Sequence, residues 1–381
     1  MIENIIYLEA SKILVYSLLA FFGGLWSGPI LITLLRWMKF WKKKSRSVAT
    51  DGTKFEYTAK FYEQDEAALK IPRAGGILIW FITLFMATFF WVLYKIDSNE
   101  VTRLLNFVSR KETFIPLGTL FSGSLVGFID DALSTMETTN QYKAGGGLHL
   151  KYRAVFILVL AFLISLWFYI KVGIESINIF NFKINFTQIH FLPDYLDKLV
   201  VSPYSLSGGI ILILITMFII VGLWTSSVID GFDGISSGTM IPIFACFGIL
   251  SFAKGFYDIS TLIFVILGSL VAYLWFNIPP AKVYMGETGM MGLLVTLAVI
   301  AIIIDAVYVL PIAGLMLVLT SASVLGQLFS KKFFKRKILL AAPLHHHFEA
   351  LGISRVQITL RYWLISVVMS ILGLAVGLIF R

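Results

Sequence analysis

The sequence predicts an all-α integral membrane protein, built as one bundle of about ten transmembrane helices. Two observations lead to this prediction. Hydrophobic residues make up 58% of the 381 residues and charged residues only 14%, whereas soluble domains are about a quarter charged. In addition, ten apolar runs approach the length of roughly 17–25 residues that crosses a bilayer as a helix. We therefore expect residues 1–381 to form a single polytopic domain.

The expected spans follow one another along the whole chain; the third and eighth are short, and the ninth is a candidate for a broken helix. They lie near 11–35, 75–95, 114–129, 153–172, 209–227, 238–254, 259–277, 289–304, 308–329 and 359–380. An even number of spans puts both termini on the same side. Residues 177–186 nearly alternate apolar and polar side chains, which predicts a short extracytoplasmic β-hairpin turning at Asn181. The polar stretch 40–70 predicts a cytoplasmic loop with a short interfacial helix.

Basic residues orient the bundle. They are concentrated in the loops after the first and ninth spans, and membrane proteins keep such loops in the cytoplasm. Both termini are therefore expected outside. The net charge of +9 comes from residues beside the spans that meet anionic lipid of the bilayer, so we expect no nucleic-acid partner. The single cysteine, Cys246, lies in an apolar run and is expected to be a core residue rather than a catalytic thiol.

Carboxylates gather beside spans that end in the cytoplasm. Asp130 and Asp131 follow the third span, Asp230 and Asp233 follow the fifth, and Glu287 follows the seventh. Charged groups at such positions are costly to bury and therefore indicate function. Adjacent carboxylates repel unless a cation or proton lies between them, and oxygen ligands favour Mg²⁺, Mn²⁺ or Ca²⁺. A solvated helix end would explain the Asp130–Asp131 pair alone, but Asp230 and Asp233 on the same face favour a metal site.

Two loops on this side carry further polar groups. Prolines and glycines break any helix between Asn277 and Gly289, and Asn277, Tyr284 and Glu287 suit a nucleobase together with a metal. Taken alone, an ordinary turn between spans explains this loop better. Arg73, just before the second span, suits a phosphate, and a membrane anchor explains it equally well. Lys151 and Arg153 are most simply membrane-edge anchors, with phosphate contact as the alternative.

Three consecutive histidines, His345, His346 and His347, follow the ninth span. Successive side chains on a helix point about 100° apart, so the three could not all bind one ion. We therefore expect a loop that presents imidazoles to phosphate or sugar, with a plain surface loop as the alternative. All of these polar motifs face one compartment. That arrangement favours an enzyme, because transporters place polar groups at mid-membrane.

Four motifs resemble, in order, those of the polyprenyl-phosphate N-acetylhexosamine-1-phosphate transferases. They are Gly127-Phe-Ile-Asp-Asp131, Asp230-Gly-Phe-Asp-Gly234, Asn277 with Met285-Gly-Glu-Thr-Gly289, and Pro343-Leu-His-His-His-Phe-Glu349. The resemblance covers nearly the whole chain. The triple-histidine motif is similar to that of the branch that uses UDP-MurNAc-pentapeptide, whereas Pro72-Arg-Ala-Gly-Gly76 looks closer to sister enzymes that use UDP-GlcNAc.

The resemblance implies Mg²⁺-dependent transfer of phospho-MurNAc-pentapeptide from UDP-MurNAc-pentapeptide to undecaprenyl phosphate, giving lipid I and UMP. This is the first membrane step of peptidoglycan synthesis, at the cytoplasmic face of the bacterial plasma membrane, and the family expectation is a homodimer. A sister transferase that moves another HexNAc-1-phosphate is the alternative, and a non-enzymatic lipid-sugar transporter is less favoured. Direct attack by the lipid phosphate and an aspartyl-phosphate intermediate both stay open.

The resemblance also implies a role for individual residues. Those with catalytic roles are Asp130 (the base toward the lipid phosphate), Asp131, Asp233 and His346. The implied metal ligands are Asp131, Glu287 and Asp233. The implied substrate-binding residues are Asp230, Gly231, Phe232, Asn277, Tyr284, Gly286, His345, His347 and Arg73. The family usually has Asp where this chain has Glu287, whose longer arm changes the expected metal geometry.

Overall fold

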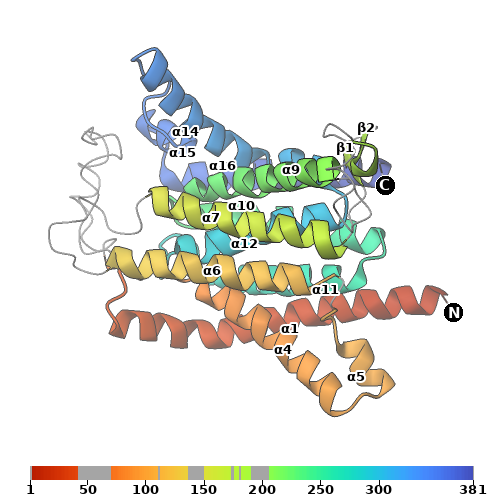
Figure 1. The fold of residues 1–381 in the computed structure, drawn as a ribbon. Coiled ribbons are helices and arrows are strands. Elements are labelled where there is room, and N and C mark those ends of the chain that lie inside the picture. Colours follow the sequence, from red (N-terminus) through yellow and green to blue (C-terminus); the bar gives the residue numbers. More distant parts are fainter. Residues whose placement is uncertain are drawn as a thin grey trace.

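The computed structural model describes residues 2–41, 70–109, 112–135, 150–172, 176–179, 182–189 and 206–380. Its helices lie side by side in one bundle (Figure 1), which confirms the all-α membrane fold. The predictions for residues 42–69 and for the turn at Asn181 lie outside the described residues.

Within these ranges, eight helices are long and apolar enough to cross a membrane, and nine if a bent pair counts as one span. The eight are α1 (Ile2–Trp37), α4 (Ile77–Ile96), α7 (Leu150–Trp167), α9 (Leu206–Trp224), α10 (Ile235–Ala253), α11 (Tyr257–Asn277), α12 (Gly286–Ile303) and α16 (Arg355–Ile379). Each coincides with one of the expected spans.

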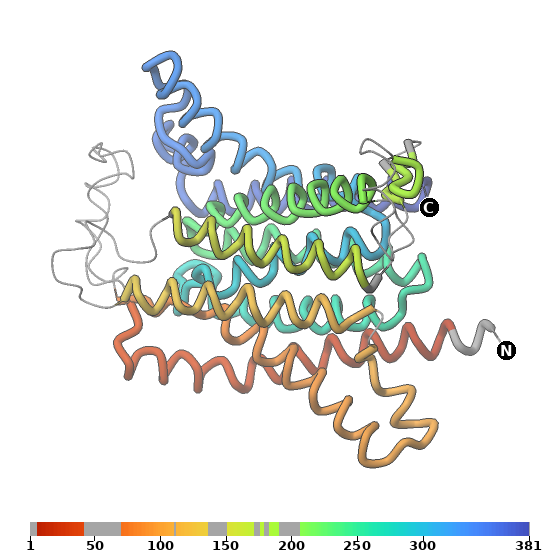
Figure 2. The backbone as a smooth tube through the Cα atoms, viewed as in Figure 1, coloured from red at the N-terminus to blue at the C-terminus, as the bar shows by residue number. Residues whose placement is uncertain are grey.

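The two remaining expected spans depart from a plain apolar helix. The ninth is broken, as expected: residues 307–313, which include α13 (Leu310–Ala313), meet α14 (Leu315–Phe333) at 80°. As a result, α14 leans away from the bundle (Figures 1 and 2). The third is α6 (Phe114–Thr135). Its 22 residues give a length of about 33 Å, and it continues past the expected end at 129.

The core lies around α12, which is buried along almost its whole length. The outer helices instead expose large apolar side chains, among them Trp26 on α1, Phe85 on α4 and Leu364 on α16. Exposed apolar surface on this scale is unusual for a protein in water. Here it provides the surface that contacts the lipid chains.

The paired strands of the predicted hairpin are confirmed, and its extracytoplasmic location stays a prediction. Strands β1 (Ser176–Ile179) and β2 (Phe182–Asn185) are antiparallel, with Ile177 opposite Ile184. The backbone N–H of Asn178 donates to Asp305 Oδ1 at 2.9 Å, and the Asn178 side-chain amide donates to Asp305 Oδ2. These bonds fasten β1 to the end of α12. Figure 1 shows the hairpin at the end of the bundle where both termini lie.

Short elements complete the described chain. They are α5 (Glu100–Leu105), the π-helix Phe168–Val172, the 3₁₀ helices Phe186–Gln188, Thr225–Ile229 and Val307–Val309, and α15 (Leu344–Ala350). The last of these, α15, lies toward the end of the bundle opposite the termini (Figure 1).

Candidate active site

The site is built on the close crossing of α6 and α12. A Cβ at Gly127 of α6 would lie 2.1 Å from the carbonyl oxygen of Glu287. Only glycine therefore permits this approach, as at other small-residue crossings of membrane helices. The crossing sets Asp130 and Asp131, on the next turn of α6, against the first turn of α12. Both aspartates are buried, at 2% and 1% exposed.

One arginine joins two of the carboxylates. Arg153, near the start of α7, places Nη2 2.7 Å from Asp130 Oδ2 and Nη1 2.7 Å from Glu287 Oε1. The three side chains come from α7, α6 and α12. The predicted role of Arg153 as a simple membrane-edge anchor is therefore wrong.

Asp131 uses its two oxygens differently. Its Oδ2 accepts from the backbone N–H of Thr288 at 3.0 Å and from Thr288 Oγ1 at 2.7 Å. Its Oδ1 is buried and has no hydrogen-bond partner in the described structure. The same is true of Glu287 Oε2. Buried carboxylate oxygens without a partner are costly, so both atoms are suited to a ligand.

The loop from Asp230 to Gly234 meets this cluster from the other side. Asp230 Oδ1 accepts from Ser236 Oγ at 2.7 Å, and Oδ2 accepts from the backbone N–H of Gly286 at 3.1 Å. Burial raises the pKa of Asp230 above its ordinary value. The hydrogen bond from Ser236 and the charge of Arg73 lower this pKa, but by less than burial raises it. Asp230 therefore ties its loop to the start of α12, and the charge of Arg73 acts on it.

Asp233 and Asn277 connect this loop to the segment between α11 and α12. Asp233 Oδ2 accepts from the backbone N–H of Ala281 at 2.9 Å. Asn277 is 2% exposed; its Oδ1 accepts from Gly234 N at 3.0 Å, and its Nδ2 donates to Val283 O at 2.9 Å. The side chain of Asn277 thus holds two loops together. Its implied contact with uridine stays a prediction.

Helix α16 supports the same loop from outside. Trp363 Nε1 donates to the carbonyl oxygen of Gly234 at 2.9 Å, and Thr359 Oγ1 donates to that of Asp233 at 3.3 Å. The sequence alone does not indicate either residue, because tryptophan and threonine are ordinary residues of an apolar span.

The three histidines lie on the short helix α15, so the expectation of a loop is wrong. The rings of His345 and His346 lie 4.6 Å apart between centroids, and both pack against Phe232. His345 is 0% exposed and neither ring nitrogen has a hydrogen-bond partner in the described structure. Its ring packs edge-on against Phe232 at 4.9 Å between centroids. A Cβ at Gly231 would lie 2.4 Å from His345 Nε2, so the two motifs touch.

The other histidines have polar partners. His346 Nδ1 lies 2.8 Å from Glu349 Oε2, and Arg355 Nε donates to Glu349 Oε1 at 2.7 Å. His347 Nδ1 accepts from the backbone N–H of Leu340 at 3.2 Å. Burial alone raises the pKa of Glu349, but the hydrogen bonds from His346 and Arg355, with the charge of Arg355, hold that pKa below its ordinary value.

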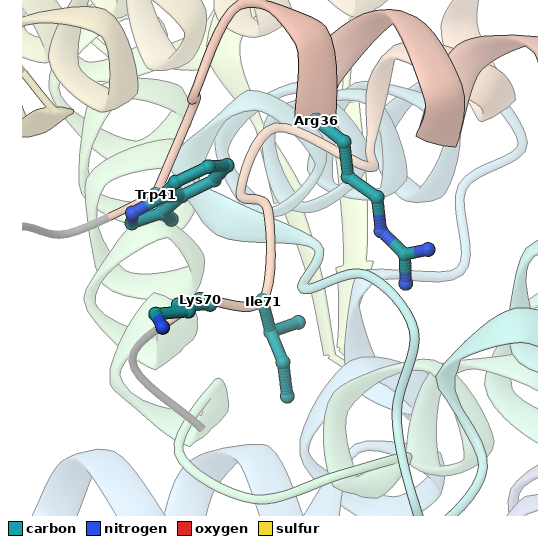
Figure 3. A pocket seen from close by; sticks show the side chains of 4 residues that line it. All are labelled: Arg36, Trp41, Lys70 and Ile71. Carbon is teal, nitrogen blue, oxygen red and sulfur yellow. The ribbon is translucent and has the colours of Figure 1, made fainter. Parts of the chain in front are cut away.

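Arg73 belongs to the segment that precedes α4, at the border of the site. Its backbone N–H donates to Phe40 O at 2.8 Å, and Pro72 O accepts from Tyr284 N at 2.8 Å. A cavity of about 440 Å³ beside this segment is lined by Arg36, Trp41, Lys70 and Ile71. Figure 3 shows the Arg36 and Lys70 side chains pointing in different directions. The two cations therefore do not converge on one point in this structure.

The residues partly fit the expected Mg²⁺. Among the described residues, no three His, Cys, Asp or Glu side chains are grouped as a ready-made metal site. Asp233 bonds to Ala281 N, and Arg153 bridges Asp130 and Glu287. However, Asp131 Oδ1 and Glu287 Oε2 are unpartnered carboxylate oxygens, which are the ligand type that Mg²⁺ prefers. This donor set fits a divalent cation, and the full ligand set stays a prediction.

Fold and site together define a multi-pass membrane protein with a carboxylate-rich site at the end of its bundle away from the termini. The sequence profile of glycosyl transferase family 4 matches residues 113–305. Three phospho-N-acetylmuramoyl-pentapeptide-transferases are similar along most of the chain. The protein from Chloroflexus aggregans is 31% identical over 74% of this chain and 74% of its own. That from Pelagibacter ubique is 28% identical over 80% and 79%, and that from Staphylococcus carnosus is 27% identical over 96% and 99%.

The chain therefore belongs to glycosyl transferase family 4 and, within it, to the phospho-N-acetylmuramoyl-pentapeptide-transferases. It is an enzyme of the phosphotransferase class and a multi-pass bacterial membrane protein.

Proposed function

We propose that the chain transfers phospho-MurNAc-pentapeptide from UDP-MurNAc-pentapeptide to undecaprenyl phosphate, with Mg²⁺, forming lipid I and UMP. The main support is the convergence of Asp130, Asp131 and Glu287 at one end of an apolar bundle. The names of its relatives support the transferred group. We further propose that this end faces the cytoplasm, where a soluble sugar nucleotide meets a lipid acceptor.

Transfer of a phosphoryl group depends on charge neutralisation and alignment more than on covalent help. When bound, Mg²⁺ would neutralise the charge of the pyrophosphate and orient it. Asp131 and Glu287 would hold the ion through their unpartnered oxygens, and Asp233 is the third proposed ligand.

The side chains divide the remaining work. Asp130, oriented by Arg153, is the proposed base toward the lipid phosphate. Asp230 keeps the first turn of α12 beside its own loop. Phe232 of this loop packs edge-on against His346, with ring centroids 5.1 Å apart, and His346 is proposed to meet the donor phosphate or sugar.

The test is a two-donor assay on the purified protein with undecaprenyl phosphate. We expect UMP and a lipid-linked product from UDP-MurNAc-pentapeptide, loss of both with EDTA, and their return with added Mg²⁺. Product from UDP-GlcNAc but not from the muramoyl donor would assign the chain to the sister activity. Absence of UMP from either donor would contradict a transferase.

A further inference from the structure

The contacts of Arg153 extend beyond the orientation of Asp130 that the proposed function gives it. Its guanidinium contacts carboxylates from two other helices at 2.7 Å each, Asp130 through Nη2 and Glu287 through Nη1. The side chains of Arg153, Asp130 and Glu287 are 18%, 2% and 21% exposed. A planar guanidinium can serve two acceptors at once in this way, whereas an ammonium is a point charge.

The carboxylates around Arg153 require a positive charge close to them. Asp130 and Asp131 are adjacent in sequence, and Arg153 brings Glu287 to Asp130. Buried carboxylates repel one another unless a cation lies among them, and an unpaired buried charge is strongly destabilising. With no ion bound, Arg153 supplies this compensating charge.

The two carboxylate oxygens of Glu287 have different surroundings. Its Oε1 bonds to Arg153, while its Oε2 is buried without a hydrogen-bond partner in the described structure. Asp131 Oδ1, the other unpartnered oxygen, belongs to the residue next to Asp130. The guanidinium and the open oxygens therefore belong to one cluster of carboxylates.

We propose that Arg153 is a positioning residue that acts as the resident counter-cation of this cluster, and that a divalent cation competes with its guanidinium for Glu287. The inference rests on the proposed function, since the divalent cation is the cofactor of that function. Competition for one carboxylate is a thermodynamic coupling, so loss of one cation strengthens binding of the other.

The experiment measures Mn²⁺ binding by electron paramagnetic resonance on the full-length protein in detergent, without substrate. Arg153→Gln removes the charge and keeps a polar side chain. We expect this variant to bind Mn²⁺ roughly fivefold or more tightly than the parent, and to melt at a lower temperature when no ion is present. Arg153→Lys should fall between the two, because it keeps the charge and loses the double contact.

Two controls identify the cause. Lys151→Gln removes the same charge from an exposed side chain on the same helix and should bind Mn²⁺ as the parent does. In a Glu287→Asp background, whose arm is one methylene shorter, Arg153→Gln should give a smaller gain, since the competition runs through Glu287.

Each outcome is decisive. Unchanged or weaker Mn²⁺ binding by Arg153→Gln overturns the proposal, as does binding by neither protein. Binding that appears only in Arg153→Gln supports it. The two-donor assay is independent of this measurement. A parent that makes no UMP contradicts the proposed function, whereas unchanged Mn²⁺ binding by Arg153→Gln in an active parent overturns this inference alone.

Discussion

The two oxygens of Asp131 lead to the sharpest prediction at the scale of single residues. Asp131→Asn can keep an oxygen facing the N–H and Oγ1 of Thr288 while it loses the negative charge. We expect turnover to fall below detection and the melting temperature to stay close to that of the parent. Assays of UMP release and thermal melts check this. Asp97→Asn, at an exposed aspartate after α4, is the control and should be active. Normal turnover by Asp131→Asn would contradict the metal site.

Thr288 is the partner that holds Asp131 in place. Thr288→Val keeps the shape of the side chain and removes the hydroxyl that donates to Asp131 Oδ2 at 2.7 Å. A hydrogen bond to a charged group contributes about 1.5–3 kcal/mol, so we expect kcat/KM to fall roughly tenfold or more. Thr288→Ser, which retains the hydroxyl, should stay close to the parent. A loss in Thr288→Ser without a loss in Thr288→Val would show that the methyl group matters instead.

Residues whose chemistry is visible in a local motif could be predicted from the sequence. The four aspartates and Glu287 belong here, because a carboxylate beside an apolar run is conspicuous. Arg153 could not, since a basic residue at the start of a span is the ordinary membrane anchor. The motif around Asn277 marks it as a polar site residue, but its amide bonds to Gly234 and Val283 depend on distant segments coming together. Thr288 follows Glu287 directly, and its position in the first turn of α12 was a usable signal.

At the scale of elements, the crossing of α6 with α12 can be tested by adding one methyl group. Gly127→Ala would place a Cβ 2.1 Å from Glu287 O and force the helices apart. Overpacking typically costs about 1–3 kcal/mol, and we expect both a lower melting temperature and a loss of turnover. Gly118→Ala, on the same helix with open space around it, should change neither. Parent-like behaviour of Gly127→Ala would contradict the close packing of α6 against α12.

Helix α15 leads to a prediction about pH. Burial, followed by the neighbouring His346, lowers the pKa of His345 well below 6.5. The unfolded chain therefore takes up this proton at a higher pH than the folded protein does. Stability from this residue is complete above pH 6.5 and is lost as the pH falls toward the folded pKa.

We therefore expect the melting temperature of the parent to fall between pH 6.5 and pH 5. The melting temperature of His345→Asn should fall less over that interval. The melting temperature of His347→Asn, a change on the same helix, should fall as that of the parent does. Thermal melts in detergent across the interval measure this. A parent whose melting temperature does not change over the interval would show that His345 remains accessible to protons.

The membrane-spanning helices could be predicted from the lengths of the apolar runs, whereas α15 could not be predicted from the sequence. Each long span coincides with an apolar run, because a bilayer dictates the length of a helix that crosses it. The triple-histidine segment has no such constraint. Its seven-residue helix is set by packing of His345 against Phe232 and Gly231, which are more than a hundred residues away.

At the scale of the whole molecule, orientation is the property to test. The hairpin and both termini share one end, and α15 lies toward the other (Figure 1). Cys246 is buried, so a new cysteine at the surface can be labelled with little background reaction from Cys246. We expect Lys183→Cys in β2 to react with a membrane-impermeant maleimide on intact cells. Lys337→Cys, between α14 and α15, should react only after permeabilisation. The reverse pattern would place the site outside the cell.

The bonds between Asn178 and Asp305 have a practical consequence. They fasten a two-stranded hairpin to the end of α12 farthest from Asp131 and Glu287. The hairpin thus lies at the opposite end of α12 from these carboxylates, and in the proposed orientation it faces the outside of the cell. A nanobody raised against it should bind the folded enzyme without inhibiting it. Such a complex would add mass and shape outside the micelle, and would align this small membrane protein for cryo-electron microscopy while its substrates bind freely.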